Sequence, residues 1–300
     1  MMKISIGPCL FDWGKQGITD FYKRMAFETE ADILYIGEVV CSKRLHLTPD
    51  ELFKLAQELK SSGKEIVLST LGLVMSEAEQ VEIHDLTVKA KEAGLRIEAN
   101  DMAAIGVAEG HSLVAGPHVN TYNPETLDFL KEVGVNRVVM PVELSAKYMS
   151  GIFRGREGVE SEVFAYGHLP LTFSARCYTA RAFNLPKVNC QYKCGDYPNG
   201  MPMHTQENSQ FLVINGTETM SELVYNLIAD IKQLQELGID IVRLSPQSQN
   251  MNEVVKIWKD SIAGTMDIGE ALAKLRELNG KDPFCNGYFH ERPGLEFIQS

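Results

Sequence analysis

The stretch Gln235-Glu236-Leu237-Gly238, followed by Asp240-Ile241-Val242-Arg243-Leu244-Ser245, shows the pattern that decides the fold. A glycine directly after helix-forming residues suits the left-handed position at which many helices end. The short aliphatic, β-branched run that follows is typical of a strand buried on both faces. Because the same succession recurs around Gly63, Gly94 and Gly134, we expect helices to alternate with buried parallel strands.

About eight strands alternate with helices along the chain, which is the count of a (β/α)8 barrel. A doubly wound open sheet is the alternative, but no Gly-x-Gly-x-x-Gly follows a strand, which removes its commonest cofactor signature. Capping boxes that begin at Thr48 and Ser76, and the pair Asn123-Pro124, indicate three helix starts. The expected strands are residues 3–6, 32–36, 65–70, 95–99, 112–115, 136–141, 162–165 and 240–245.

Two features predict an irregular barrel. The connection after the strand at 112–115 is short, and a long polar insertion, residues 174–217, follows the seventh strand. No linker rich in Pro, Gly or Ser and no low-complexity tract divides the chain. We therefore expect one TIM-like barrel domain, residues 1–300, with a cysteine-bearing insertion inside it.

Composition sets the class of protein. The 300 residues are 44% hydrophobic and 23% charged, which is typical of a soluble globular domain. Neither a signal peptide nor an apolar run of the roughly 20 residues of a membrane span is present, so the default expectation is the cytoplasm. The net charge of −11, with basic residues gathered only at Lys43-Arg44 and between Arg176 and Arg181, argues against nucleic-acid binding and suits at most a small anionic ligand.

Four of the six cysteines form a candidate metal centre. Cys41 follows the second expected strand, Cys177 follows the seventh, and Cys190 and Cys194 lie in the insertion. Segments that follow barrel strands emerge at one face, so these thiols can converge. Structural zinc usually shows two short cysteine pairs, whereas iron–sulfur clusters tolerate scattered ligands. Spacing alone leaves open that these are four unrelated thiols. Cys9 and Cys285 are left as free thiols.

The segment Glu162-Val163-Phe164-Ala165-Tyr166-Gly167-His168-Leu169-Pro170-Leu171-Thr172-Phe173-Ser174-Ala175-Arg176-Cys177 resembles the signature of the collagenase-like U-type peptidase family. That signature reads Glu-x-Phe-x-x-Gly-small-aliphatic-Cys, then four residues and Gly-x-Cys. Glu162, Phe164, Gly167, Leu169 and Cys177 match it, whereas His168, Pro170 and Ala175 depart from it.

Proline at position 170, where the family has a cysteine, points to one branch of the family. In that branch, which acts in ubiquinone biosynthesis, a distant cysteine completes the ligand set, and here Cys41 takes that place. The resemblance implies a [4Fe–4S] cluster on Cys41, Cys177, Cys190 and Cys194, and a heterodimer with a sibling family protein, UbiU. Further similar stretches are residues 63–70, 140–145, 166–171, 197–200, 242–247 and 285–288.

The function that this resemblance implies is oxygen-independent hydroxylation of the ubiquinone precursor ring. His168 is a candidate acid or base, although a hydrogen-bonded packing role is the commoner one for such a histidine. Arg176 is a candidate carboxylate-binding residue beside Cys177, with a solvated surface arginine as the alternative. Glu38, Asp101, Asn120 and Glu143 are weaker candidates after other strands.

Three readings of the function stay open from the sequence. The first is an iron–sulfur subunit of the hydroxylase, whose cluster either moves electrons or only holds the insertion together. The second is a non-catalytic partner that stabilises the true enzyme. The third is a peptidase, although the sequence contains neither His-Glu-x-x-His nor Gly-x-Ser-x-Gly. The lipid-like precursor could reach the protein through a lipid-binding carrier.

Overall fold

Eight parallel strands close into a barrel in the computed structural model, which describes residues 2–44, 46–108, 111–280 and 284–299. Strand β11 closes the ring because it pairs in parallel with both β1 and β7. The (β/α)8 barrel is therefore confirmed, and seven strands lie within two residues of their expected bounds. The barrel strands are β1 (Lys3–Ile6), β2 (Ile33–Ile36), β3 (Glu65–Ser69), β4 (Arg96–Ala99), β5 (Leu113–Ala115), β6 (Val135–Val139), β7 (Glu160–Phe173) and β11 (Ile241–Leu244).

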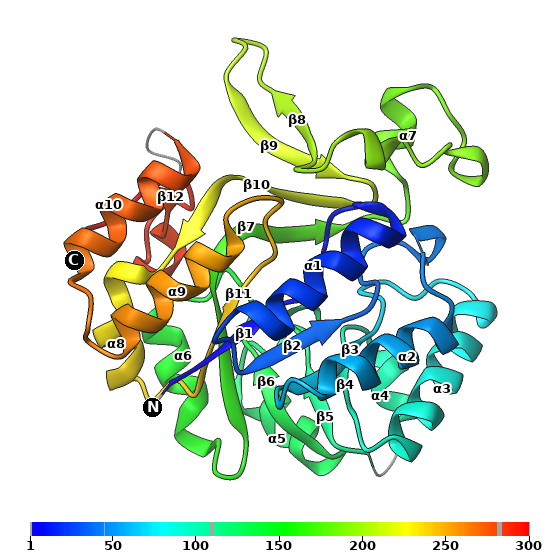
Figure 1. The fold of residues 1–300 in the computed structure, drawn as a ribbon, viewed down its shortest axis with the longest axis horizontal. Helices are drawn as coiled ribbons and strands as arrows, with labels where there is room; N and C mark the ends of the chain where they lie inside the picture. The colour runs from blue at the N-terminus through cyan, green and yellow to red at the C-terminus, as the bar shows by residue number, and fades with distance from the viewer. Residues whose placement is uncertain (1, 45, 109–110, 281–283, 300) are drawn as a thin grey trace.

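Helices cover the outside of the barrel (Figure 1). Local sequence sets their starts, since the hydroxyls of Thr48 and Ser76 and the amide oxygen of Asn123 each accept a backbone N–H of the first helical turn, as expected. The helices are α1 (Gly14–Glu28), α2 (Pro49–Lys60), α3 (Glu77–Glu92), α4 (Met102–Val107), α5 (Pro124–Glu132), α6 (Ala146–Ile152), α7 (Tyr178–Ala182), α8 (Ile231–Glu236), α9 (Met251–Ile262) and α10 (Ile268–Asn279).

Strand β7 is much longer than the sequence predicts. The expected strand ends at Ala165, but β7 continues to Phe173 because β10 (Glu218–Asn226) pairs with it in antiparallel fashion. Gly167 and Pro170 are poor strand residues, yet the register shifts on β10 next to the partner of Pro170 accommodate a residue without an N–H. The expected end at Ala165 was therefore wrong.

Residues 174–217 connect the ends of β7 and β10 and project from the barrel (Figure 1). This segment, called the excursion below, contains α7 followed by two short antiparallel strands, β8 (Met201–His204) and β9 (Gln210–Asn215). β9 continues the pairing onto β10, which in turn pairs with the short strand β12 (Phe284–Cys285). The excursion is thus tied to the barrel through the β7–β10 ladder.

Charged residues fill the barrel interior and are paired there. The guanidinium of Arg243 lies 2.7 Å from a carboxylate oxygen of Glu98 and 2.7 Å from one of Glu162. Glu162 also accepts hydrogen bonds from the hydroxyls of Ser5 (2.6 Å) and Tyr35 (2.5 Å). A buried ion is tolerated only when its partners replace water, so this network explains how two acidic residues sit in the core.

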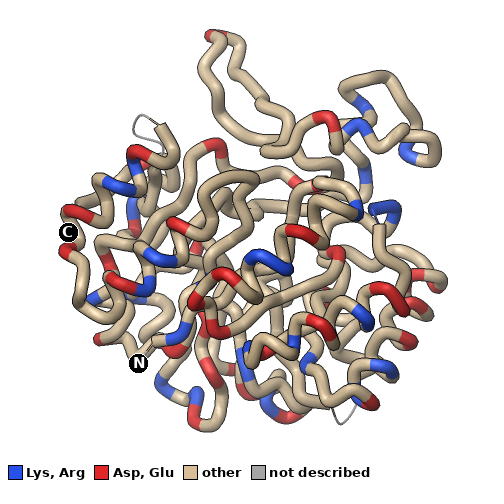
Figure 2. The backbone as a smooth tube through the Cα atoms, in the orientation of Figure 1, with Lys and Arg blue, Asp and Glu red and all other residues tan. Residues whose placement is uncertain are grey.

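Surface charges of both signs are mixed over the helices (Figure 2). The first half of the excursion differs, because its charged residues are all Lys or Arg, drawn blue in Figure 2. In the described parts of the chain no helix combines the length and apolar character needed to span a membrane. The basic residues of the first half of the excursion are Arg176, Arg181, Lys187 and Lys193.

Candidate metal centre

Cys41 lies in a turn that the side chain of Glu38 holds in place. After β2 ends, one carboxylate oxygen of Glu38 accepts the backbone N–H groups of Val40 (2.8 Å) and Cys41 (2.9 Å). The hydroxyl of Thr217, at the end of the excursion, donates to the carbonyl oxygen of Val40 at 2.7 Å. The Cys41 turn is thus fixed by its own chain and anchored to the excursion.

Cys177 sits at the beginning of α7, where it acts as the N-cap residue. Its sulfur accepts the backbone N–H of Ala180 at 3.4 Å. Local structure therefore fixes the position of the Cys177 sulfur at the start of α7.

Cys190 and Cys194 lie in two short 3-10 turns, and the N–H of Lys193 donates to the carbonyl of Cys190 at 3.3 Å. The thiol of Cys194 donates to a carboxylate oxygen of Asp12 at 3.3 Å. Tyr192, between the two cysteines, takes a left-handed conformation with φ of 51°. The x3 spacing therefore forms a compact turn that faces the loop after β1.

Hydrogen bonds hold the three cysteine-bearing segments together. The ammonium of Lys43 donates to the carbonyl of Val188 at 3.0 Å, which joins the Cys41 turn to the Cys190 turn. The ammonium of Lys187 donates to the carbonyl of Ala175 at 3.0 Å, which joins the Cys190 turn to the Cys177 turn. Figure 1 shows α7 and its loop above the turn that follows β2, at the end of the barrel where its strands terminate.

Burial separates the four candidate ligands from the other two cysteines. Cys41, Cys177, Cys190 and Cys194 are half-buried free thiols, whereas Cys9 and Cys285 are buried in the core. Burial raises the pKa of the Cys285 thiol to about 12. A ligand must be reachable, so the half-buried set is the more accessible one for a metal.

Thiolates are the donors that an iron–sulfur cluster requires, and the chain carries four free thiols on three segments. Among the described residues, no three His, Cys, Asp or Glu side chains gather closely enough to hold one metal ion. The four cysteines of a [4Fe–4S] cluster each bind a different iron, so they stand further apart than ligands around one ion. Cys177, Cys190 and Cys194 lie in a stretch of chain whose charged residues are basic, which is compatible with a negatively charged group.

A buried arginine lies beneath these turns. Arg44 follows Cys41 closely and is only 3% exposed. Its guanidinium donates to the carbonyl of Leu10 at 3.0 Å and to the side-chain oxygen of Asn215 at 2.8 Å, and it lies 4.0 Å from Asp12. Burial raises the pKa of Cys194 to about 11, while the nearby Arg44 acts in the opposite direction. Arg44 is therefore placed to compensate negative charge on that sulfur.

A model of peptidase family U32 matches residues 22–299. The chain belongs to this family. The family expected from residues 162–177 is thereby confirmed. Among solved structures, the U32 peptidase Mk0906 is 11% identical, with 83% of this chain and 94% of that chain covered and a TM-score of 0.46. A putative dihydrodipicolinate synthetase from Pseudomonas aeruginosa is 9% identical, with coverage of 93% and 82% and a TM-score of 0.49.

The residues that match the U32 signature hold the barrel together. Glu162 is the fully buried partner of Arg243 described above. Gly167 has a φ of +125°, and a Cβ there would lie 2.6 Å from the Cβ of Ser245, so only glycine fits. In this chain the first part of the signature is therefore structural, and Cys177 is its part at the candidate metal centre.

The two candidate catalytic residues have different environments. His168 is inside β7 rather than after it, and its Nδ1 lies 2.9 Å from the carbonyl oxygen of Ser221. Burial lowers its pKa, so the ring is neutral near pH 7. Arg176 is exposed at the start of the excursion, where its N–H donates to the hydroxyl of Ser174. His168 has the environment of a packing residue, and Arg176 that of a surface residue.

The weaker candidates mostly have local structural roles. Asp101 caps α4, because its carboxylate accepts the N–H of Ala103 at 2.8 Å. Asn120 takes a left-handed conformation with φ of 61°. Glu143 accepts a hydrogen bond from the hydroxyl of Tyr122.

Sequence reasoning missed two acidic residues below the cysteine turns. Asp12 contacts Cys194, and its position shortly after the first strand was a usable signal. Glu218 is fully buried at the start of β10, where it accepts the side-chain N–H of Asn215 at 2.9 Å. Burial raises the pKa of Glu218 to about 8 and that of Glu38 to about 7. Nothing local in the sequence indicates that Glu218 is buried.

Proposed function

We propose that this U32 chain is the UbiV-type subunit of an oxygen-independent hydroxylase that acts on the ubiquinone precursor ring. It holds a [4Fe–4S] cluster on Cys41, Cys177, Cys190 and Cys194, within one barrel domain of residues 1–300 that has a cluster-binding insertion, residues 174–217. The observation that supports this proposal is the meeting of three cysteine-bearing segments through direct hydrogen bonds at the carboxyl end of the barrel.

Three of the four proposed ligands have a residue of this chain that positions them or compensates their charge. Glu38 holds the backbone of Cys41, the N–H of Ala180 points at the sulfur of Cys177, and Arg44 lies near Cys194. A bound cluster would supply one-electron transfer, and hydroxylation without O2 requires in addition a separate oxygen donor and a final electron acceptor. The buried cation and the N–H donor both favour negative charge on sulfur, and both would raise the reduction potential.

The partner in this proposal is the sibling protein UbiU, in a heterodimer. The precursor ring, with its lipid-like tail, reaches the pair from a lipid-binding carrier in the cytoplasm. Arg176, which is exposed beside Cys177, is proposed to bind a carboxylate of the substrate. His168 is proposed only as a neutral hydrogen-bonding group, because burial lowers its pKa.

Anaerobic reconstitution of the purified chain tests the cluster. We expect about four irons and four sulfides per chain and a brown colour that is lost in air. Co-expression with UbiU then tests the activity, with hydroxylation of the precursor in the absence of oxygen as the measurement. A chain that binds no iron under these conditions contradicts the cluster, and hydroxylation by UbiU alone contradicts the requirement for this chain.

The peptidase reading is the second candidate, and membership of peptidase family U32 favours it. Gelatin turnover by the purified chain, measured with and without reconstituted iron, tests this reading directly.

The non-catalytic partner reading predicts a different result. In that case this chain raises the yield of soluble UbiU, but hydroxylation per UbiU is unchanged when this chain is omitted.

A further inference from the structure

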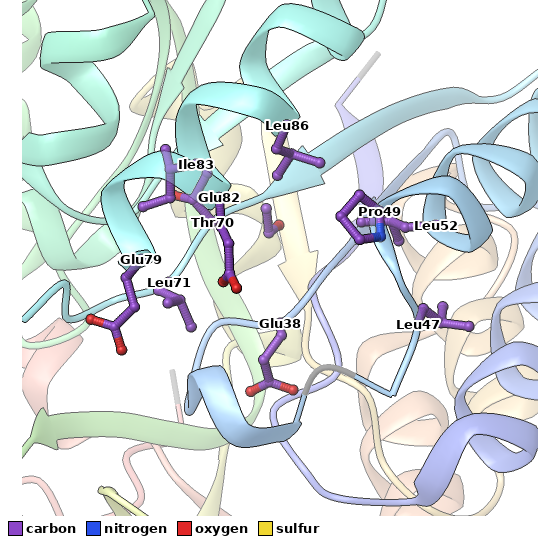
Figure 3. A pocket seen from close by; sticks show the side chains of 11 residues that line it. Glu38, Leu47, Pro49, Leu52, Thr70, Leu71, Glu79, Glu82, Ile83 and Leu86 are labelled. Carbon is purple, nitrogen blue, oxygen red and sulfur yellow. The ribbon is translucent and has the colours of Figure 1, made fainter. Parts of the chain in front are cut away.

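A cavity of about 100 Å³ lies between α2 and α3, beyond the ends of β2 and β3. A site needs roughly 10–15 Å³ of such volume to hold one water molecule, so this cavity has room for several heavy atoms. By comparison, the cavity at the mouth of the barrel, next to Arg243 and His118, has only about 20 Å³. Figure 3 shows the lining residues of the larger cavity, which come from α3, from the start of α2 and from the loops after β2 and β3.

The walls of this cavity are aliphatic. Leu71 and Ile83 are buried, and the half-buried side chains of Leu47, Leu52 and Leu86 complete the apolar surface. Figure 3 shows these side chains on several sides of the space. Such walls favour burial of apolar ligand atoms, at about 25 cal/mol for each Å² removed from water. The cavity therefore suits a hydrocarbon group.

The polar atoms of the floor already have partners. The hydroxyl of Ser69 donates to a carboxylate oxygen of Glu98 at 2.5 Å, and the hydroxyl of Thr70 donates to the carbonyl oxygen of Glu98 at 3.0 Å. Both hydroxyl protons are thus used inside the protein. A ligand group that needs hydrogen-bond donors, such as a phosphate or a carboxylate, therefore finds neither of these hydroxyls free.

The charged residues that line the cavity are all acidic. Glu79 accepts the hydroxyl of Ser42 at 2.7 Å and the N–H of Met75 at 2.7 Å, so its carboxylate is held in place. Glu82 is exposed on α3, and Glu38 lies at the opposite side of the cavity (Figure 3). No Lys, Arg or His is among the described lining residues. This rim disfavours an anionic ligand.

We propose that this cavity binds an uncharged prenyl or alkyl chain of a small molecule. Glu38 connects the cavity to the candidate metal centre, because it lines the cavity and its carboxylate holds the N–H of Cys41. A chain bound here therefore places the rest of its molecule beside the Cys41 turn. That the natural ligand is the tail of the ubiquinone precursor rests on the proposed function, whereas the binding of a neutral chain does not.

Titration of the full chain with geraniol, a neutral isoprenoid alcohol, tests the cavity by calorimetry. Leu86→Trp should fill the space and weaken binding at least tenfold. Val88→Trp is the matched control, because Val88 is exposed on the same helix and does not line the cavity. No binding of geraniol, or equal binding by the Leu86→Trp and Val88→Trp variants, overturns the proposal.

The acidic rim gives a second measurement that does not depend on the packing of the cavity. Geranyl phosphate should bind at least tenfold more weakly than geraniol, and Glu82→Lys should narrow this difference several-fold. Glu92→Lys, at the exposed far end of α3, should leave it unchanged. Equal affinity for the two compounds in the unmodified chain contradicts the proposed preference for uncharged ligands.

The same titrations separate the two proposals. If geraniol binds as expected but the pair with UbiU does not hydroxylate the precursor, the proposed function fails and the cavity stands. If hydroxylation occurs and the Leu86→Trp variant binds geraniol as the unmodified chain does, the cavity proposal fails and the function stands.

Discussion

The barrel interior and the excursion use their reactive side chains in opposite ways. Inside the barrel, Arg243 and Glu162 are fully buried, and the carboxylate of Glu162 has partners from three other elements. In the excursion, Cys177, Cys190 and Cys194 are half-buried on short turns. The interior groups mostly pair with one another, although one guanidinium nitrogen of Arg243 has no hydrogen-bond partner among the described residues. The thiols of the excursion, in contrast, are the proposed ligands of a bound metal group.

Substitution of the cysteines is expected to have the largest effect. It should change metal binding by the excursion and leave the barrel interior as it is. Cys177→Ser or Cys194→Ser should remove most of the iron from the reconstituted chain, because each thiolate binds a separate iron. The unfolding midpoint of the iron-free protein should stay the same, since neither thiol supports the barrel. Iron analysis and urea denaturation measure the two quantities.

Cys285→Ala provides the control, because this cysteine is buried on β12 away from the excursion. It should keep the iron content and lose some stability. Full iron retention in the Cys177→Ser and Cys194→Ser variants would show that the excursion provides no ligand to the metal centre.

Glu162→Gln changes the barrel interior and leaves the excursion unchanged. Removing one member of a buried ion pair costs about 3–5 kcal/mol, because the remaining charge loses its partner. We expect a loss of that size in the free energy of unfolding, with unchanged iron content in the protein that stays folded. Glu92→Gln, on the exposed end of α3, should change the stability by less than about 0.5 kcal/mol. Equal stability of the two variants would show that Arg243 does not need Glu162.

Gly167→Ala tests the backbone at the point where β7 leaves the barrel and leads toward the excursion. The left-handed φ of +125° and the close approach to Ser245 should cost about 2 kcal/mol of stability. Gly155→Ala is the matched control, because a Cβ at Gly155 meets no atom within 4 Å and its φ is not positive. Thermal unfolding of both variants measures this difference in stability. Equal stability of the two variants would show that β7 accommodates a Cβ at position 167.

The pH dependence of stability is expected to show the smallest effect per pH unit. Glu218 has a pKa of about 8 in the folded protein and 4.5 as the ordinary value, because burial disfavours its charged form. The folded state therefore holds a proton that the unfolded state releases, and stability falls as the pH rises from about 5 to 8. One such proton contributes at most about 1.4 kcal/mol per pH unit.

Glu218→Gln should flatten this slope, as urea denaturation between pH 5 and 8 would measure. Glu38 has a raised pKa of about 7 and contributes in the same direction, so part of the slope should remain. An unchanged slope in the Glu218→Gln variant would show that this carboxyl is ionised in the folded protein.

Local signals predicted most of the barrel. Seven strands and the helix starts at Thr48, Ser76 and Asn123 match because each depends on a few neighbouring residues. The seventh strand was predicted too short because Gly167 and Pro170 indicate a break locally. Pairing with β10, a strand more than 40 residues later in the chain, overrides that signal.

The candidate site was likewise predictable from the sequence only in part. The sequence, through its U32 signature, selected Cys177 and the other three cysteines, since ligand chemistry belongs to residue types and their order. Only the tertiary structure placed Asp12 and Arg44 beside Cys194 and buried Glu218 beneath them. Burial and cavity shape depend on contacts between distant segments, and no local pattern encodes them. The sequence by itself therefore predicted the barrel, which the structure confirms, and proposed the four cysteines as ligands, whereas only the folded chain decided their surroundings and the cavity near Cys41.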